Sequence, residues 1–310
     1  MKHPRLRDFF AWATIAVSSV ICGAGEPSTQ SSSPHSYAPA KGATSAPLEL
    51  RHGVPFVKVM INGKGPFTFI IDTGTSSDAI VTPALAATLG LQVVERRHLT
   101  DLGGQNVQGV NVVAIQKLTV AGVDFPSVHA DVHAALTTVG PYDGILGFRL
   151  FRNELMTLDY PRHRLVLSVG DSLQSGDPNV LPLHMSRLVP TVILEIGNEP
   201  VEAQIDSGGQ GICVPESVAE SLKFQGSLDV VARGHTQVST FPILGGKIDE
   251  DVEFAGHTFD KPFIEIIPNF PVADVGSGTL QDFVVSFDQK HCLARFFTTR
   301  KNIRIASDWQ

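Results

Sequence analysis

The chain has 310 residues, of which 43% are hydrophobic and 18% are charged. This length predicts about two domains, and the composition is that of an ordinary globular protein, which excludes collagen-like and largely disordered chains. The formal net charge is −7, and no basic run is interleaved with aromatic residues. Because phosphate binding needs clustered Lys and Arg, we expect no nucleic-acid partner.

The amino-terminal residues have the layout of a secretory signal. Lys2, Arg5 and Arg7 precede the apolar stretch Phe9–Ile21, and small residues follow it. That stretch is too short to span a bilayer comfortably, so residues 1–25 are predicted to be a cleaved signal peptide. The mature chain would then be exported, to the periplasm or out of the cell, without a stable membrane span. An uncleaved anchor is the alternative.

The next segment, residues 26–47, is rich in Ser, Pro, Ala and Gly and has almost no large apolar residues. Such a segment cannot bury enough surface to offset the entropy lost on ordering, so we predict a flexible linker. Ordered structure is expected to begin near Leu48. Whether the linker also serves as a propeptide stays open.

The remainder of the chain contains an internal duplication. Residues 54–75 and residues 189–209 share one order of features: Val-Pro, an alternating strand, a turn, a second strand, and then Asp-Thr-Gly or Asp-Ser-Gly. An Ala-Gly turn follows each of these aspartates at the same spacing. We therefore predict two homologous lobes, 48–170 and 176–300, joined through the Gly/Ser/Asp/Pro-rich stretch 171–178.

Strand patterns dominate both lobes. Most segments are short, β-branched or aromatic, and bounded by Gly, Pro, Asn or Asp, which is typical of strands. The predicted helices are few, namely Pro83–Leu89, Pro215–Leu222 and Phe148–Leu155. The fold class is therefore all-β, with one barrel-like sheet system in each lobe and a few short helices.

The duplicated motif places a carboxylate at the end of an apolar strand. In each lobe this acid is followed by a hydroxyl residue and a glycine, as Asp72-Thr73-Gly74 and Asp206-Ser207-Gly208. An acid in that position is costly unless it is hydrogen-bonded or catalytic, and glycine permits a tight turn that presents N–H groups to it. A duplicated fold brings the two turns to a pseudo-two-fold axis, so we expect the carboxylates to face each other.

Two facing carboxylates cannot both ionise cheaply, so they hold one proton between them. The ionised carboxylate can activate a water, while the protonated one polarises a carbonyl and then protonates the leaving amine. Asp72 and Asp206 are thus predicted to hydrolyse peptide bonds in extended segments, with acidic to mildly acidic activity. This chemistry requires no cofactor, no metal and no covalent intermediate.

The sequences FIIDTGTSS, AQIDSGG and YDGILGF resemble those of the aspartic peptidase superfamily, over about residues 48–300. The segments 99–122 and 143–160 are closer to bacterial retropepsin-like peptidases than to pepsin. The resemblance implies two acid-protease-type β-barrel lobes with a cleft between them, a six-stranded sheet, and a β-hairpin flap that closes over an extended peptide or protein substrate. We expect a monomer from a bacterium.

The resemblance also implies roles for residues of the motif. Asp72 and Asp206 fall on the catalytic aspartates, and Thr73 and Ser207 fall on the hydroxyls that grip the opposite loop. Thr75 falls on the residue that hydrogen-bonds the outer oxygen of the first aspartate.

The supporting element of the first lobe, Ile145-Leu146-Gly147, matches the family's apolar-apolar-Gly pattern. The second lobe departs from the pattern at two positions. Gly209 stands where a second outer hydroxyl is expected, and Asp274 stands in an apolar position of the matching element. Whether these two departures abolish activity stays open.

The flap also departs from the pepsin pattern, because no tyrosine lies between Leu99 and Ala121. Gly103 and Gly104 are predicted to form the flap tip instead.

Three alternatives remain. The main alternative is a relative that binds peptides without cleaving them. A second is an actin-like ATPase, which also uses Asp-x-Gly-Thr, but the strand-rich pattern opposes it. His129 and His133 have the spacing of a metal pair but lack the glutamate of a zincin, so we predict no metal site. Cys213 and Cys292 form either a disulfide or two separate thiols.

Overall fold

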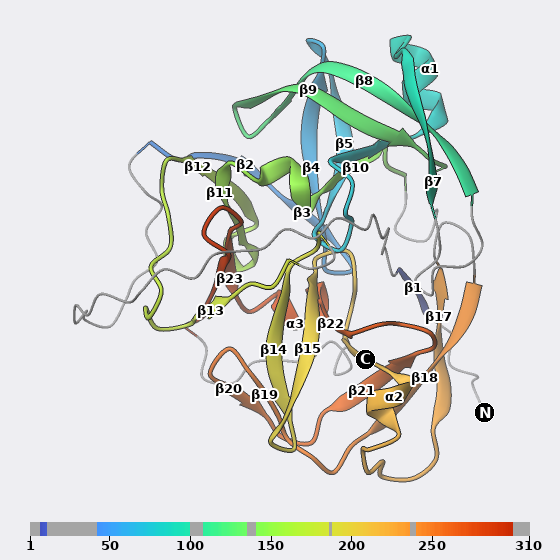
Figure 1. Ribbon diagram of the computed structural model, residues 1–310, viewed down its shortest axis with the longest axis vertical. Coiled ribbons are helices and arrows are strands. Elements are labelled where there is room, and N and C mark those ends of the chain that lie inside the picture. Colours follow the sequence, from blue (N-terminus) through green and yellow to red (C-terminus); the bar gives the residue numbers. More distant parts are fainter. Residues whose placement is uncertain are drawn as a thin grey trace.

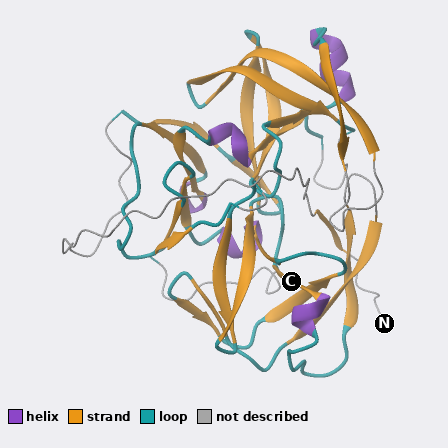
Figure 2. Cartoon of the chain, in the orientation of Figure 1, coloured by secondary structure: helices purple, strands orange, loops and turns teal. Residues whose placement is uncertain are grey.

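The computed structural model describes residues 7–10, 42–99, 108–134, 141–185, 188–235 and 240–299. Of these residues, 57% lie in strands and 9% in helices, and the helices are short pieces scattered among the strands (Figure 2). The all-β prediction is confirmed. No helix within these ranges combines the length and the apolar character that crossing a membrane requires.

An eight-stranded sheet forms the first lobe, in the strand order β3-β4-β5-β10-β6-β9-β8-β7 (Figure 1). Its strands are β3 (Glu49–Arg51), β4 (Val54–Ile61), β5 (Lys64–Asp72), β6 (Ala79–Val81), β7 (Val93–Leu99), β8 (Gln108–Val120), β9 (Val123–Val132) and β10 (Gly144–Gly147). A further pairing between β4 and the end of β8 joins the strands from β4 to β8 into a closed ring.

A ten-stranded sheet forms the second lobe, in the strand order β1-β17-β18-β21-β16-β22-β15-β14-β19-β20. Its strands are β1 (Arg7–Phe10), β14 (Thr191–Ile196), β15 (Glu199–Asp206), β16 (Ile212–Pro215), β17 (Asp229–His235), β18 (Thr240–Lys247), β19 (Val252–Phe254), β20 (His257–Phe259), β21 (Phe263–Ile267) and β22 (Ala273–Gly276). No pairing among the described strands closes this sheet into a ring, so a barrel in the second lobe stays a prediction. Strand β1 comes from the segment predicted to be a signal peptide.

The two sheets repeat one strand order. The run β4-β5-β10-β6-β9-β8-β7 in the first lobe corresponds to β14-β15-β22-β16-β21-β18-β17 in the second, with the same parallel and antiparallel pairings. The hairpin β4–β5 turns at Asn62-Gly63, and β14–β15 turns at Gly197-Asn198, with positive φ at all four residues. Two consecutive positive φ angles suit a two-residue hairpin, and Asn and Gly adopt them most readily. The shared order supports the predicted duplication.

A third, six-stranded sheet joins the lobes, in the order β13-β24-β23-β11-β12-β2. Its strands are β2 (Thr44–Pro47), β11 (Glu154–Asp159), β12 (Arg164–Val169), β13 (Val180–Pro182), β23 (Val284–Asp288) and β24 (Leu293–Phe297). In its centre β11 of the first lobe pairs with β23 of the second. Strand β2 comes from the predicted linker, so the prediction that residues 26–47 are a flexible linker is wrong for Thr44–Pro47.

The first predicted helix is present as α1 (Pro83–Leu89). Its Thr82 cap accepts a hydrogen bond from the Leu85 N–H at 3.2 Å, and proline opens the first turn, where no N–H is needed. The helix ends at Gly90, whose left-handed backbone glycine adopts without strain.

The other helix predictions need correction. The segment predicted as Pro215–Leu222 contains only α2 (Glu216–Ala219), and the segment predicted as Phe148–Leu155 contains only the 3-10 helix η1 (Phe148–Phe151). The chain leaves helical geometry after η1 because β11 begins at Glu154 and must pair on both sides in the third sheet. The sequence analysis did not predict α3 (Ser277–Leu280) or the 3-10 helix η2 (Tyr160–Arg162).

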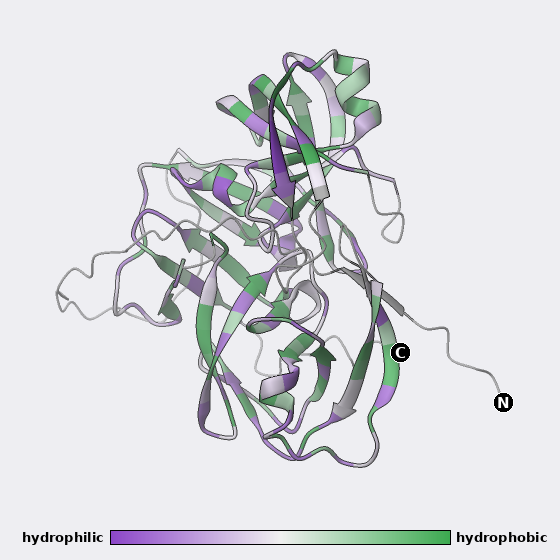
Figure 3. Ribbon diagram, turned by 45° about the vertical axis from the view of Figure 1, so that its right-hand side comes forward, coloured by the Kyte–Doolittle hydropathy of each residue, from purple (hydrophilic) through white to green (hydrophobic). Residues whose placement is uncertain are grey.

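Buried hydrophobic side chains form one large cluster that extends through both lobes and the third sheet. Along the strands, hydrophobic residues are interspersed with hydrophilic ones (Figure 3), as expected where one face of a sheet is buried. Phe148 of the first lobe packs edge-on against Phe287 of the second, with 5.3 Å between ring centroids. The continuous core fixes the lobes against each other.

Replacement of Gly144 by alanine is expected to destabilise the fold. A Cβ at Gly144 would overlap the Phe69 ring and the carbonyl oxygen of Ile80, and overpacking of this kind costs about 2 kcal/mol. Gly109→Ala is the matched control, because a Cβ there meets no atom within 4 Å. Denaturant unfolding measures both variants; equal midpoints for the two would contradict the tight packing at Gly144.

Candidate active site

The two Asp-Thr/Ser-Gly turns lie at the ends of equivalent strands. Asp72 ends β5 and pairs in register with Gly147 of the parallel strand β10, and Asp206 ends β15 and pairs with Gly276 of β22. Both partners must be glycine. A Cβ at Gly147 would overlap the Ser77 carbonyl oxygen, and a Cβ at Gly276 would overlap the backbone of Gly209 and Gln210. Each acid therefore ends its strand beside a glycine, and the backbone that follows the acid packs directly against that glycine.

Reciprocal hydrogen bonds join the two loops across the lobes. The Thr73 hydroxyl donates to the Ile205 carbonyl at 2.6 Å and accepts from the Ser207 N–H at 2.9 Å. The Ser207 hydroxyl donates to the Ile71 carbonyl at 2.7 Å and accepts from the Thr73 N–H at 2.9 Å. Four buried backbone groups are satisfied in this way, and both side chains are fully buried. We call this set the cross-lobe grip.

The two carboxyl groups meet inside this grip. Asp72 and Asp206 are both fully buried, and their side chains are hydrogen-bonded to each other. Each inner oxygen accepts a backbone N–H of its own turn, from Gly74 to Asp72 at 2.9 Å and from Gly208 to Asp206 at 2.7 Å. Each glycine also faces the opposite acid: a Cβ at Gly74 would lie 2.7 Å from Asp206 Oδ2, and one at Gly208 would lie 2.8 Å from Asp72 Oδ2.

Burial dominates the electrostatics of the pair. It raises the pKa of Asp72 well above the usual range, and the charge of Asp206 raises that pKa further. Burial also raises the pKa of Asp206, but N–H donation from Gly208 and a hydrogen bond from Asp72 limit the rise to about 6. The two acids therefore titrate as a pair, and burial together with their mutual charge favours a state in which they hold one proton between them.

The outer oxygens differ between the two acids. Thr75 Oγ1 donates to Asp72 Oδ2 at 3.1 Å, which is the contact that the resemblance implied. The equivalent position in the second lobe is Gly209, and no hydroxyl or N–H group of the described residues donates to Asp206 Oδ2. The dyad is thus asymmetric, as the glycine in the sequence indicated.

Residues 57–150 match a family model described as Aspartyl protease. This match supports an aspartyl protease. It covers most of the first lobe, including the Asp72 turn and β10, and none of the second lobe. A search of the curated proteins found no match.

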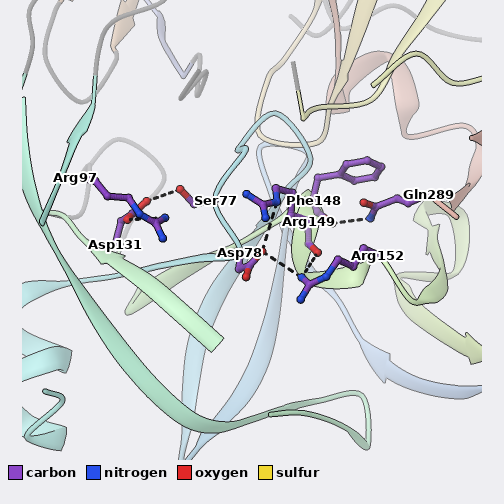
Figure 4. Close-up of polar contacts among 8 residues, drawn as sticks. All are labelled: Ser77, Asp78, Arg97, Asp131, Phe148, Arg149, Arg152 and Gln289. Atoms are coloured by element: carbon purple, nitrogen blue, oxygen red, sulfur yellow. Dashed lines mark hydrogen bonds and ion pairs between the residues drawn. The ribbon is translucent and has the colours of Figure 1, made fainter. Parts of the chain in front are cut away.

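The Asp-Thr-Gly motif of the first lobe is anchored by a network that was not predicted from the sequence (Figure 4). Ser77, which follows the motif, donates a short hydrogen bond to the buried Asp131 of β9. Asp131 lies 3.7 Å from Arg97 of β7, so one carboxylate links the loop after Asp72 to the β7–β8 hairpin. In the sequence, Asp131 stands out only because it lies between His129 and His133, since its pairing with Ile80 of β6 is not visible there.

A second contact in Figure 4 crosses between the lobes. Gln289 Nε2, after β23, donates to the carbonyl oxygen of Phe148 at 2.7 Å. In the loop after Asp72, Asp78 Oδ1 lies 3.3 Å from Nη1 of Arg152 and 3.8 Å from Nε of Arg149. These contacts hold the loop after Asp72 on η1 and therefore limit its movement relative to the dyad.

Three sequence-based expectations about other residues can now be placed. Gly103 and Gly104, the predicted flap tip, lie outside the described residues. His129 lies within β9, on the strand that was expected there. Cys213 is a buried free thiol, so the possible disulfide between Cys213 and Cys292 is not formed.

Removal of one hydroxyl from the cross-lobe grip is expected to destabilise the protein. Ser207→Ala leaves the Ile71 carbonyl and the Thr73 N–H without their buried partner, at a cost of about 2 to 4 kcal/mol in the free energy of unfolding. Ser221→Ala serves as the control, since its exposed hydroxyl bonds only the Val218 carbonyl. A Ser207→Ala protein as stable as Ser221→Ala in thermal unfolding would contradict the role of the grip.

Proposed function

We propose that the chain is an aspartic endopeptidase of the two-lobed, retropepsin-like or pepsin-like kind. The observation that carries the proposal is the buried pair of hydrogen-bonded carboxyls, one of which, Asp206, has a pKa raised to about 6. Such a pair holds a base and an acid at the same place and at the same pH, which is what the attack of water on an amide requires.

Asp206 is the base in the proposed reaction. Burial raises its pKa, but the Gly208 N–H, which donates to its Oδ1, and a hydrogen bond from Asp72 limit the rise to about 6. Its carboxylate accepts a proton from the attacking water, and protonated Asp72 donates a hydrogen bond to the carbonyl oxygen of the scissile peptide. The water oxygen bonds to the carbonyl carbon, and the C–N bond then breaks as Asp72 gives its proton to the leaving nitrogen. The proton taken from water stays on Asp206, so the pair again holds one proton. The residues of the chain supply every group in this sequence.

The substrate is proposed to be an extended peptide or protein segment, and the protein is proposed to act as a monomer. Support comes from the family match of the first lobe and from the repeated strand order of the second lobe. We also keep export, to the periplasm or outside a bacterial cell, as part of the proposal because of the signal-like residues 1–25. Recovery of an unprocessed chain from the cytosol would contradict export.

A second candidate is a relative that binds peptides without cleaving them. The observation in its favour is the missing hydroxyl at Gly209, which leaves Asp206 Oδ2 without the donor that Thr75 gives to Asp72. Saturable binding of peptides without cleavage at any pH between about 3 and 8, a span that covers the ionisation of both acids, would favour this candidate.

Replacement of either acid is expected to abolish hydrolysis. Asp72→Asn removes the proton donor and Asp206→Asn removes the base, so each lowers kcat on an unfolded protein substrate by at least about a hundredfold. Asp124→Asn is the control, because this exposed aspartate at the β8–β9 turn bonds only nearby side chains. Circular dichroism confirms folding of each variant. Cleavage that persists in Asp72→Asn would overturn the proposal.

The pH dependence of kcat/KM follows from the two pKa shifts. The free enzyme is inactive while Asp206 is protonated, so the rate rises with pH through about 6, the raised pKa of Asp206. It falls again when Asp72 loses its proton, which occurs above that value because the charge of Asp206 raises the pKa of Asp72. Initial rates across the pH range check the profile; a rising limb centred near the ordinary aspartate value of about 4 would contradict it.

A further inference from the structure

The second lobe has polar side chains where the first lobe is apolar. Strand pairing makes three positions equivalent: Ile145 and Asp274, Ile70 and Gln204, Ile80 and Cys213. Each is an isoleucine in the first lobe, and in the second lobe two of the three, Asp274 and Gln204, are polar. In the first lobe the three isoleucines share a buried apolar cluster. Polar groups are costly in such a position unless they have a partner or a function.

Asp274 lies beside the position that lacks a hydroxyl. A Cβ at Gly209 would be 2.8 Å from Asp274 Oδ2 and 3.3 Å from Asp206 Oδ2. The carboxyl group of Asp274 therefore borders the space in which a Ser or Thr side chain at position 209 would lie. In the first lobe that space belongs to Thr75, and the residue equivalent to Asp274 is Ile145.

The two carboxyl groups next to this space each have an oxygen without a donor. Asp206 Oδ2 and Asp274 Oδ1 are buried, and no donor group of the described residues contacts either one; the Asp274 oxygen that borders the space is the other one, Oδ2. Asp274 itself is 1% exposed. Buried oxygens are almost always hydrogen-bonded, and a protonated carboxyl within reach of an ionised one can donate to it.

The surroundings keep that proton on Asp274. The ionisable groups that face it are Asp206 at the end of β15, Asp72 at the end of β5, Glu265 on β21 and Cys213 on β16. All of them are acidic. Burial, and then the charges of Asp206, Asp72 and Glu265, raise the pKa of Asp274 well above the usual range.

We propose that Asp274 is a positioning residue, whose carboxyl group holds the outer oxygen of Asp206 in place of the hydroxyl that Gly209 lacks. This inference rests on the proposed peptidase function. Asp274 donates to Asp206 when Asp206 is ionised, so it stabilises the base form and fixes its orientation. Gly209 and Asp274, the two departures of the second lobe, then compensate for each other.

The test compares three substitutions by their kcat, KM and pH profile on one peptide substrate. Asp274→Ala removes the donor and is expected to lower kcat about tenfold with little change in KM. Because a hydrogen bond to a charged group is lost, the rising limb of the pH profile moves upward by about one pH unit. Asp274→Asn keeps an N–H donor, so its rising limb stays near that of the wild type. This variant also serves if Asp274→Ala does not fold.

The third substitution is the double variant Asp274→Ala/Gly209→Ser, which returns a hydroxyl to position 209 and removes the carboxyl group that would crowd it. It is expected to recover most of kcat and the original rising limb, whereas Gly209→Ser alone places its Cβ 2.8 Å from Asp274 Oδ2 and lowers activity. Ile145→Ala is the matched control in the first lobe; it loses stability but keeps the rising limb in place.

An unshifted rising limb in folded Asp274→Ala, or a double variant no better than Asp274→Ala, would overturn the inference. A second measurement tests the role of Asp274 independently of the proposed peptidase function. Carbon NMR titration of the Asp206 carboxyl follows its pKa without any substrate, and Asp274→Ala is expected to raise this pKa by about one unit. If the wild type cleaves no peptide, the proposed function fails while this titration still decides the role of Asp274.

Discussion

The structure depends on the burial of two carboxyl groups at the junction of two lobes. Water is removed from both acids, so every hydrogen bond that they receive must come from the chain. The cross-lobe grip of Thr73 and Ser207 fixes the two loops to each other, and the glycines that follow leave room for the opposite acid. Burial of the two carboxyl groups lowers the stability of the fold, and the same burial raises their pKa values. Thus the cost to stability and the capacity for acid–base chemistry have one cause.

The asymmetry of the pair follows from small differences between nearly equivalent loops. Asp72 receives a hydroxyl from Thr75, while Asp206 faces Gly209 and the carboxyl of Asp274. A strictly symmetric pair would leave the choice of base to the substrate. In this chain the two acids have different surroundings, and burial raises the pKa of both.

Much of this arrangement is predictable from the sequence because it is repeated. The all-β class, the hairpin turns, helix α1 and the facing of Asp72 and Asp206 follow from local patterns that occur twice. What could not be predicted depends on contacts between distant segments. The helix expected after Phe148 is cut short because β11 pairs on both sides, and Asp131 meets Ser77 only after β6 and β9 pair. Gly209 and Asp274 were visible as departures, but their proximity required the pairing of β15 with β22.

The third sheet has a consequence for any attempt to divide the molecule. Its central pair is β11 with β23, so Thr157 and Ser286, 129 positions apart, share a buried hydrogen bond. A fragment that ended after the first lobe would expose β11 as an unpaired edge strand, which is a template for aggregation. Pairing between strands so far apart in the sequence is expected to form late in folding, because closing the long intervening loop costs conformational entropy before the contact forms. The third sheet therefore needs strands from both predicted lobes, and neither part of the chain supplies all of its strands.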